Sequence, residues 1–432
     1  MNPAGEANGY FISKKYSYYV FSLLFMLYAF DYIDRLVVVS LFPFLIKDWG
    51  LTDAQCGALV SAVYWSIILF TFPVSLLIDR WSRKKVIGLM AVFWSLATAA
   101  CALTKNFTQL FIARTAIGVG EAGYAPGGTA MISALFPQEK RSLMVGVWNA
   151  SIPLGSALGV ALGGIVAEHF GWRHAFGLVA LPGLAVALLF FWIKDYQTVE
   201  LVKTVQADQG AGGRTRMGTG DIIREFLGTK SLIFTYLAFA GNTFLTTSLL
   251  TWLPTYFHRA EGLSMSQAGL KGSVIMLLAI VGAPVGGLLT DLWLKKRTNA
   301  RMLFSSLASL VTALTFLAAF TLFSGQGRYI VLLLGGMSAA AFSPAAIAVT
   351  QDVVHPGLRA ISYSFCAITQ NILGSSLGPL FVGLVSDRYG LSLALTLVPL
   401  FTLVSAVLYF LGSFYYDRDL AKVEKIELRV EQ

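Results

Sequence analysis

The chain has 432 residues, of which 56% are hydrophobic and only 13% are charged, whereas charged residues make up about a quarter of an ordinary soluble protein. This composition excludes a soluble globular protein and predicts membrane-spanning helices, each of which needs about 20 mainly apolar residues. The net charge of +9 comes largely from lysines and arginines in short loops between apolar runs, so it does not indicate a nucleic-acid partner.

Apolar runs bounded by charged residues, glycine and proline predict twelve spans. In chain order they are 16–44, 56–78, 86–104, 108–133, 142–167, 174–194, 230–257, 268–291, 301–323, 329–353, 360–385 and 393–416. The polar stretch between the sixth and seventh spans contains GAGGRTRMGTG and predicts a flexible linker with a short surface helix near 221–226. We therefore expect an all-α membrane protein with an N-terminal six-helix half (1–194), a cytoplasmic linker (195–229) and a C-terminal six-helix half with a cytoplasmic tail (230–432).

Basic residues are concentrated in alternate loops. The loops after the second and eighth spans each hold four, including Arg83 and Lys295, whereas the loops after the first and third spans hold Lys47 and Lys105 alone. Because basic loops stay on the cytoplasmic side, this pattern places the even-numbered loops and both termini in the cytoplasm. The expected location is the cell membrane, either a bacterial inner membrane or a plasma membrane.

The two halves repeat each other in sequence. Glycines and an acidic residue of the fifth span recur 219 positions later in the eleventh, as Gly155, Gly159, Gly164 and Glu168 become Gly374, Gly378, Gly383 and Asp387. A second pair of segments, ending at Asp79 and Asp291, lies 212 positions apart. Six spans per repeat give both halves the same orientation, so an axis along the membrane normal should relate them. Transporters with such repeats bind substrate near the midplane between the halves.

Three segments carry a resemblance to known families. Residues 75–85, SLLIDRWSRKK, resemble the loop signature of the major facilitator superfamily, with Ser75 and Ser82 where glycine is usual. The pair Asp34-Arg35 and residues 114–126, RTAIGVGEAGYAP, resemble segments of the Spinster-like transporters and of the anion:cation symporter family, which carries sugar acids and other organic anions. The resemblance covers almost the whole chain. It implies the major facilitator fold, with gating roles for the loop charges Asp79, Arg83, Asp291 and Lys295.

Spans one and four contain five ionisable residues: Asp31, Asp34, Arg35, Arg114 and Glu121. Charges at this depth are costly, so they predict function. Arginine keeps its charge and matches a carboxylate or phosphate, which makes Arg35 and Arg114 the expected anion-binding residues. A nearby arginine favours the charged form of a carboxylate, so a substrate that occupies the arginine favours protonation. Asp34 and Glu121 are therefore the expected proton-coupling residues, and the resemblance implies the same roles.

The alternative for these charges is a structural network that fastens spans one and four together. Asp31 lies four residues before Arg35 on the same helix face and can orient it. The second half offers neutral polar groups instead, which either contact the uncharged part of a substrate or join helices. The expected supporting residues are Asp31, Tyr124, Asn242, Thr247, Gln370 and Asn371.

No motif predicts a catalytic, metal or cofactor site. Cys56, Cys101 and Cys366 have no neighbour at metal-ligand spacing. The glycines of Gly118-x-Gly120-x-x-Gly123 match a dinucleotide fingerprint, but they lie in an apolar helix with no strand before it, so they indicate close helix packing. Without a nucleophile–base pair either, an enzyme is not expected.

The sequence thus predicts a monomeric, proton-coupled carrier of an organic anion that works by alternating access in membrane lipid without a cofactor. Two alternatives stay open. One is a Spinster-like exporter of a lysolipid or another amphiphile, whose phosphate binds the same arginines. The other is a receptor or scaffold with the shape of a transporter, which would tolerate replacement of the buried charges.

Overall fold

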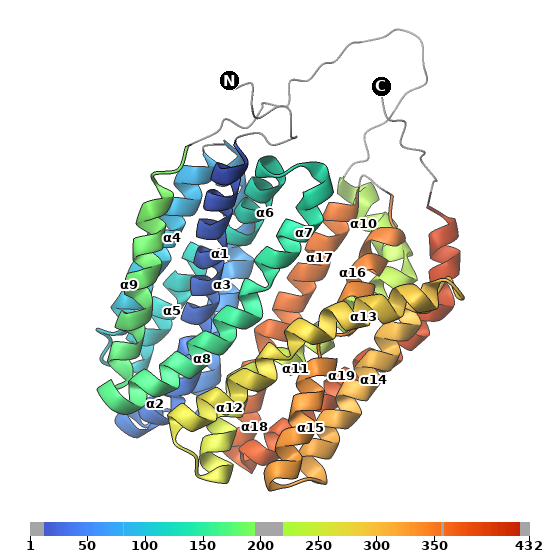
Figure 1. Ribbon diagram of the computed structural model, residues 1–432. Helices are drawn as coiled ribbons and strands as arrows, with labels where there is room; N and C mark the ends of the chain where they lie inside the picture. Colours follow the sequence, from blue (N-terminus) through green and yellow to red (C-terminus); the bar gives the residue numbers. More distant parts are fainter. Residues whose placement is uncertain (1–12, 81, 195–218, 356–357, 424–432) are drawn as a thin grey trace.

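The computed structural model describes residues 13–80, 82–194, 219–355 and 358–423. Within these ranges the chain is helical and contains no strand, which confirms an all-α protein. All twelve predicted spans are present, and six of them are interrupted by a turn or a short stretch of tighter or wider helix. Figure 1 shows two bundles side by side, one formed by α1 to α9 and the other by α11 to α19.

In the first bundle, the first span consists of three helical segments, and the fourth and fifth spans consist of two each. The helices are α1 (Lys14–Val37), η2 (Val38–Leu41), α2 (Phe42–Trp49), α3 (Asp53–Arg80), α4 (Arg83–Cys101), α5 (Phe107–Glu121), α6 (Tyr124–Leu135), α7 (Gln138–Asn149), α8 (Ser151–Phe170) and α9 (Trp172–Phe190). The short helix α10 (Thr219–Gly228) then lies where the sequence predicted a surface helix near 221–226.

The second bundle repeats this plan. Its helices are α11 (Lys230–Glu261), α12 (Met265–Leu277), α13 (Ala279–Leu294), α14 (Ala300–Thr321), α15 (Gly325–Ser338), α16 (Ser343–Asp352), α17 (Arg359–Thr369), the π-helix η4 (Gln370–Ser375), α18 (Leu377–Tyr389) and α19 (Leu391–Ala421). The eleventh span thus consists of α17, η4 and α18. The start of α1 and the end of α19 lie toward one end of the molecule in Figure 1, which we call the terminal face; the opposite end is the distal face.

Ten segments of the described chain are long and apolar enough by themselves to cross a bilayer. The first and fourth spans are the two exceptions. Helix α1 carries buried charges and several tyrosines, while α5 and α6 are each shorter than the roughly 20 residues that a bilayer core requires. These are the spans in which the sequence predicted the chemistry, so the low hydropathy marks the candidate site.

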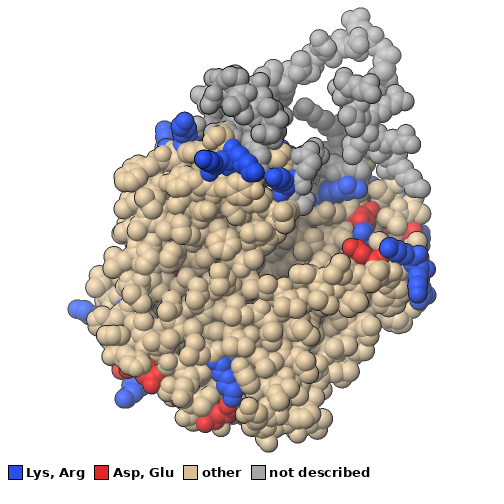
Figure 2. Space-filling model, viewed as in Figure 1, with Lys and Arg blue, Asp and Glu red and all other residues tan. Residues whose placement is uncertain are grey.

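The sides of the molecule are apolar. Figure 2 shows lysine and arginine at its ends, most of them toward the terminal face, with few charges between. Large side chains such as Leu181 and Phe414 are more than two thirds exposed on the sides, which suits contact with lipid rather than water. The apolar belt agrees with the predicted multi-pass membrane protein.

The repeated glycines bring each broken span against the first helix of its own half. On α8, a Cβ at Gly155 or Gly159 would lie closer than 3.0 Å to a main-chain carbonyl oxygen of α1. On the eleventh span, Gly374 and Gly378 meet α11 in the same way. Glycine permits this approach because it has no side chain to place between the backbones. The sequence repeat is therefore a repeated helix contact.

The two halves meet toward the distal face, where α3 packs against α18 and α8 against α12. Toward the terminal face, Figure 2 shows a recess between the halves. This arrangement closes the space between the halves at one end and leaves the other end parted.

Candidate functional site

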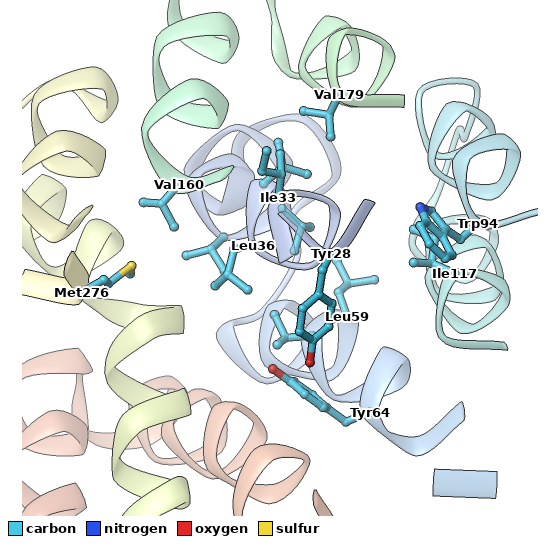
Figure 3. Packing of buried hydrophobic residues seen from close by; sticks show 14 of the residues in the cluster. Tyr28, Ile33, Leu36, Leu59, Tyr64, Trp94, Ile117, Val160, Val179 and Met276 are labelled. Carbon is cyan, nitrogen blue, oxygen red and sulfur yellow. The ribbon is translucent and has the colours of Figure 1, made fainter. Parts of the chain in front are cut away.

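Helix α1 occupies the centre of the first half, and the site is built around its broken end. Figure 3 shows α1 surrounded by residues of its neighbours, including Leu59 of α3, Trp94 of α4 and Val160 of α8. After Val37 the chain continues as the 3-10 helix η2, and Pro43 opens α2. A change of helix type and a proline both interrupt the regular pattern of main-chain hydrogen bonds. Carbonyl groups near the end of α1 are consequently available to side chains.

Arg114 of α5 binds these carbonyl groups. Its Nη1 donates to the carbonyl oxygen of Asp34 at 2.8 Å and its Nη2 to that of Arg35 at 2.9 Å, while Nε donates to Leu59 of α3 at 3.2 Å. The residue is 0% exposed. Arg114 therefore joins α5 to α1 and α3, and in this conformation its donors are directed at the main chain rather than at the space between the halves.

Arg35 lies in a different environment. Its Nη2 donates to Asp31 Oδ2 at 2.8 Å, and its Nε lies 2.7 Å from Glu121 Oε2 of α5. The second contact is an ion pair without the alignment of a hydrogen bond. The side chain of Arg35 is 12% exposed, whereas both carboxylates are fully buried. One cation is thus shared by two buried acids, and the predicted pairing of Asp31 with Arg35 is present.

Two tyrosine rings flank this arginine. The guanidinium carbon of Arg35 lies 4.7 Å from the centre of the Tyr32 ring and 5.8 Å from that of Tyr64 on α3. In Figure 3 the hydroxyl groups of Tyr64 and Tyr28 point toward each other. Aromatic faces attract a cation within about 6 Å, so Tyr32 and Tyr64 help to hold Arg35 in place.

Asp34 lies near this cluster but makes no hydrogen bond with it. It is 0% exposed, and neither carboxylate oxygen has a hydrogen-bond partner among the described residues. The hydroxyl group of Thr98 on α4 lies near Asp34 and is also buried without a well-aligned hydrogen bond. Asp34 is therefore a buried acid in a polar neighbourhood that does not satisfy it, a costly arrangement for a charged carboxylate.

The remaining predicted residues make contacts within the protein. Tyr124 is buried and donates to the carbonyl oxygen of Leu24 at 2.6 Å, and Asn242 donates to Ser309 of α14 at 3.0 Å. Thr247 donates to the main chain of its own helix. These contacts place the three residues in helix packing in the present conformation.

Gln370 and Asn371 begin the π-helix η4. Gln370 Oε1 accepts a 3.4 Å hydrogen bond from Thr243 of α11, and the partly exposed side chain of Asn371 has no hydrogen bond to a described residue. A π-helix widens the turn and often occurs at functional sites. Of the neutral polar candidates, Asn371 is the one that keeps its side chain available.

The four predicted gating residues are described unequally. The side chains of Asp79 and Arg83 lie outside the described set. Asp291 and Lys295, at the end of α13, are exposed and make no ion pair or hydrogen bond with any described residue. Asp291 lies in the last turn of α13 and Lys295 directly follows this helix, at the end of α13 opposite the distal face.

Sequence reasoning missed the charged residues that join the halves at the distal face. Asp53 of α3 pairs with Arg259 of α11 at 2.6 Å, and Asp387 of α18 accepts from the main chain of α3. A signal was present in the repeat: residues 50–57, GLTDAQCG, recur as residues 262–269, GLSMSQAG, at the offset of 212. The two segments have the same helix-start pattern.

The chain matches known transporters over most of its length. Residues 24–379 fit the model of the Major Facilitator Superfamily. The chain is 28% identical to the hexuronate transporter of Bacillus subtilis (strain 168), with 86% of this chain and 88% of that protein covered. It is 27% identical to the sphingosine-1-phosphate transporter SPNS2 of Danio rerio, with 90% and 83% covered.

The fold also matches a solved structure. A bacterial homolog to the human lysosomal transporter Spinster, crystallised in an inward-facing and unoccupied conformation, superimposes with a TM-score of 0.81. The match covers 94% of this chain and 99% of that one at 21% identity, so it supports the fold. The family model, the twelve spans in two repeated halves and the buried charges agree: this chain is a transporter, not an enzyme, and it belongs to the major facilitator superfamily.

Proposed function

We propose that the chain is a proton-coupled carrier of a small organic anion, with Arg35 as the residue that meets the anion. The observation that carries this proposal is the sharing of Arg35 between two buried acids, Asp31 and Glu121. Arg35 is the cation of the cluster that keeps an exposed edge. A carboxylate or phosphate is a bidentate partner for a guanidinium group, so an entering anion competes with Glu121 for it.

The proton step follows from this competition. When the substrate occupies Arg35, Glu121 loses its counter-charge while it remains fully buried. A buried carboxylate without a counter-charge binds a proton rather than staying charged. Asp34, which already lacks a hydrogen-bond partner, is the second proposed proton carrier. Anion binding and proton uptake are thereby linked, and the empty carrier returns with Glu121 paired with Arg35 again.

The second arginine acts differently in the proposal. Arg114 would contact an anion only after releasing the main-chain carbonyl groups of Asp34, Arg35 and Leu59. We propose that it does so in another conformation of the cycle, and that in the present one it holds the broken end of α1. Asp31 orients Arg35, while Tyr124, Asn242, Thr247, Gln370 and Asn371 support the site or contact the neutral part of the substrate.

The relatives favour an acidic substrate and differ in its size. The Bacillus subtilis relative is a hexuronate transporter and the Danio rerio relative transports sphingosine-1-phosphate. The anionic groups of both are compatible with Arg35. We propose a sugar acid as the substrate, because the buried cluster of acids suits the proton-coupled uptake of a small anion. A lysolipid is the competing candidate.

The location completes the proposal. The terminal face, with its basic loops, lies on the cytoplasmic side of a cell membrane, and both termini are cytoplasmic. The loop charges Asp79, Arg83, Asp291 and Lys295 pair between helices when this face closes and part when it opens. The carrier works as a monomer, since each chain contains both halves and the site between them.

Uptake into proteoliposomes tests the function. The purified chain is reconstituted, and accumulation of sugar acids, monocarboxylates and lysophospholipids is measured with and without an inward proton gradient. We expect gradient-driven accumulation of a sugar acid. We expect Glu121→Gln to keep exchange of substrate for substrate but to lose gradient-driven accumulation, because the amide has the shape of the protonated acid and cannot release a proton.

The control is Asp417→Asn, which removes an exposed carboxylate bonded to Thr298. This variant should accumulate substrate like the unaltered protein. Full gradient-driven accumulation by Glu121→Gln and by Asp34→Asn would contradict the proton assignment. Accumulation of lysophospholipid alone would replace the sugar acid by the lysolipid.

A further inference from the structure

The distal closure consists of two helix contacts that are copies of each other. In one, α3 of the first half packs on α18 of the second; in the other, α12 of the second half packs on α8 of the first. We call them the α3–α18 seam and the α8–α12 seam. The offset of 212 relates α3 to α12, and the offset of 219 relates α8 to α18. Each residue of one seam therefore has a counterpart in the other.

Each seam is capped by a carboxylate from the opposite half. Asp387 Oδ1 accepts from the N–H of Asp53 at 2.7 Å, and its Oδ2 accepts from the N–H of Ala54 at 3.0 Å. Glu168, the counterpart of Asp387, accepts from the N–H of Ser266, the counterpart of Ala54, at 2.9 Å. The first N–H groups of a helix lack partners in their own helix and attract negative charge, so each carboxylate bonds to the start of a helix in the other half.

The backbones approach closely behind these caps. A Cβ would lie closer than 3.0 Å to a carbonyl oxygen across the seam at four glycines, Gly57, Gly164, Gly269 and Gly383. Ser61 donates to the carbonyl oxygen of Ser376, and its counterpart Ser273 donates to that of Ala157 at 2.7 Å. The glycines and serines thus recur in both seams, and so does the carboxylate cap, although Asp387 accepts two main-chain hydrogen bonds and Glu168 accepts one.

Charge breaks the symmetry. At the α3–α18 seam, Asp53 Oδ1 and Oδ2 accept from Arg259 at 2.6 and 2.7 Å, and Ser386 donates to Asp53 at 2.6 Å. At the α8–α12 seam the counterparts of these three residues are Met265, Lys47 and Ala167. Met265 and Ala167 are buried, and Lys47 is exposed without a hydrogen bond or ion pair to a described residue.

We infer that the distal gate opens in order, first at the α8–α12 seam and then at the α3–α18 seam. Both seams must part before the opposite access state is reached. Both then lose a carboxylate cap and the glycine and serine contacts, and the α3–α18 seam loses one more cap hydrogen bond than the α8–α12 seam. Only the α3–α18 seam also loses a bidentate, partly buried ion pair, which belongs to the stronger class of charged hydrogen bonds. This inference concerns the gate alone and does not depend on the substrate or the proton.

Double electron–electron resonance, which measures distances between spin labels, tests the order in which the two seams open when the protein is in lipid nanodiscs. One labelled pair is His169→Cys with Leu270→Cys at the α8–α12 seam. The other is the matched pair at the α3–α18 seam, Arg388→Cys with Ala58→Cys, which occupies the counterpart positions. The three native cysteines are buried, and the chain without added cysteines gives the background.

We expect a larger long-distance population for the first pair than for the second in the full-length protein. Arg259→Met should raise the long-distance population of the second pair about three- to tenfold, the effect of a partly exposed bidentate ion pair. Lys47→Met, at the counterpart position, should leave both pairs unchanged. Equal populations in the two pairs, or equal effects of Arg259→Met and Lys47→Met, would overturn the inference.

A gain of contact gives an independent test. Met265→Asp places a carboxylate at the counterpart of Asp53, where Lys47 becomes its partner, and should reduce the long-distance population of the first pair. Met265→Asn, which adds the polarity without the charge, should not reduce it. A monodisperse elution profile shows that each variant is folded, and equal populations in the Asp and Asn variants would count against the inference.

Discussion

At the scale of single residues, two arginines of the same cluster have opposite surroundings. Arg35 is bonded to acids and keeps an exposed edge, whereas Arg114 is fully buried and bonded to main-chain carbonyl groups. A buried carbonyl group that loses its partner costs about 1–3 kcal/mol. Arg35 can therefore exchange its partner for a substrate, whereas Arg114 supports the backbone of α1.

We therefore predict opposite effects of the same substitution at the two positions. Arg114→Lys leaves carbonyl groups of Asp34, Arg35 or Leu59 without a donor and should destabilise the substrate-free protein by about 2–4 kcal/mol. Arg35→Lys keeps the charge but loses the planar fork, so it should leave the melting temperature almost unchanged and weaken substrate binding at least tenfold. Thermal unfolding in detergent and binding titrations measure the two quantities.

A different result would assign the roles differently. If Arg114→Lys melts like the unaltered protein and loses only substrate binding, Arg114 is an anion ligand in the resting state rather than a support of α1. Arg114→Gln serves as a second variant, because its side-chain amide keeps two N–H donors and removes the charge.

At the scale of helices, the packing of α8 on α1 depends on glycine. A Cβ at Gly159 would meet the carbonyl oxygen and Cα of Ile33 closer than 3.0 Å, whereas nothing lies within 4 Å of a Cβ at Gly177 on α9. We predict that Gly159→Ala destabilises the protein by about 1–3 kcal/mol, the usual cost of overpacking. Gly177→Ala is the matched control and should be neutral or stabilising by up to about 1 kcal/mol. Equal melting temperatures for the two variants would contradict this account of the repeat.

Much of the helix arrangement was predictable from the sequence. The partners that some buried side chains find on other helices were not. Apolar runs predicted the twelve spans, and the four-residue spacing of Asp31 and Arg35 predicted their pairing. Spacing also placed Arg114 on one face of its helix with Glu121, but it does not say what lies opposite that face. The broken end of α1 lies there, and only the folded structure shows that its carbonyl groups take the donors of Arg114.

The distal seams were missed for a related reason. Residues 50–57 and 262–269 repeat each other, yet they lie at helix starts, where polar residues are expected for capping within one helix. Thr52 and Gln55 do cap α3 in this way, as do Ser264 and Gln267 for α12. The additional caps, from carboxylates of the opposite half, join segments that are far apart in the chain. No local pattern predicts such a partner.

At the scale of the whole molecule, the halves share their fold and differ in their chemistry. The buried charges of the candidate site lie on α1 and α5 in the first half, while the corresponding region of the second half is neutral. The two seams of the distal gate also differ. The additional ion pair, Asp53 with Arg259, lies at the α3–α18 seam, whose carboxylate cap comes from the second half. A substrate between the halves would therefore contact charged residues of the first half and neutral residues of the second. We expect the opening of the distal gate to be asymmetric as well.

The orientation of the whole molecule in the membrane follows from its two ends. The loop between α13 and α14, at the terminal face, carries Lys295, Lys296 and Arg297, whereas the distal loops after the first and third spans carry Lys47 and Lys105 alone. Short loops rich in lysine and arginine remain in the cytoplasm. In intact cells we expect a membrane-impermeant maleimide to label Lys47→Cys at once and Lys296→Cys only after permeabilisation, with little background because the native cysteines are buried. The reverse pattern would show that the terminal face is external and that the sealed end of this conformation faces the cytoplasm.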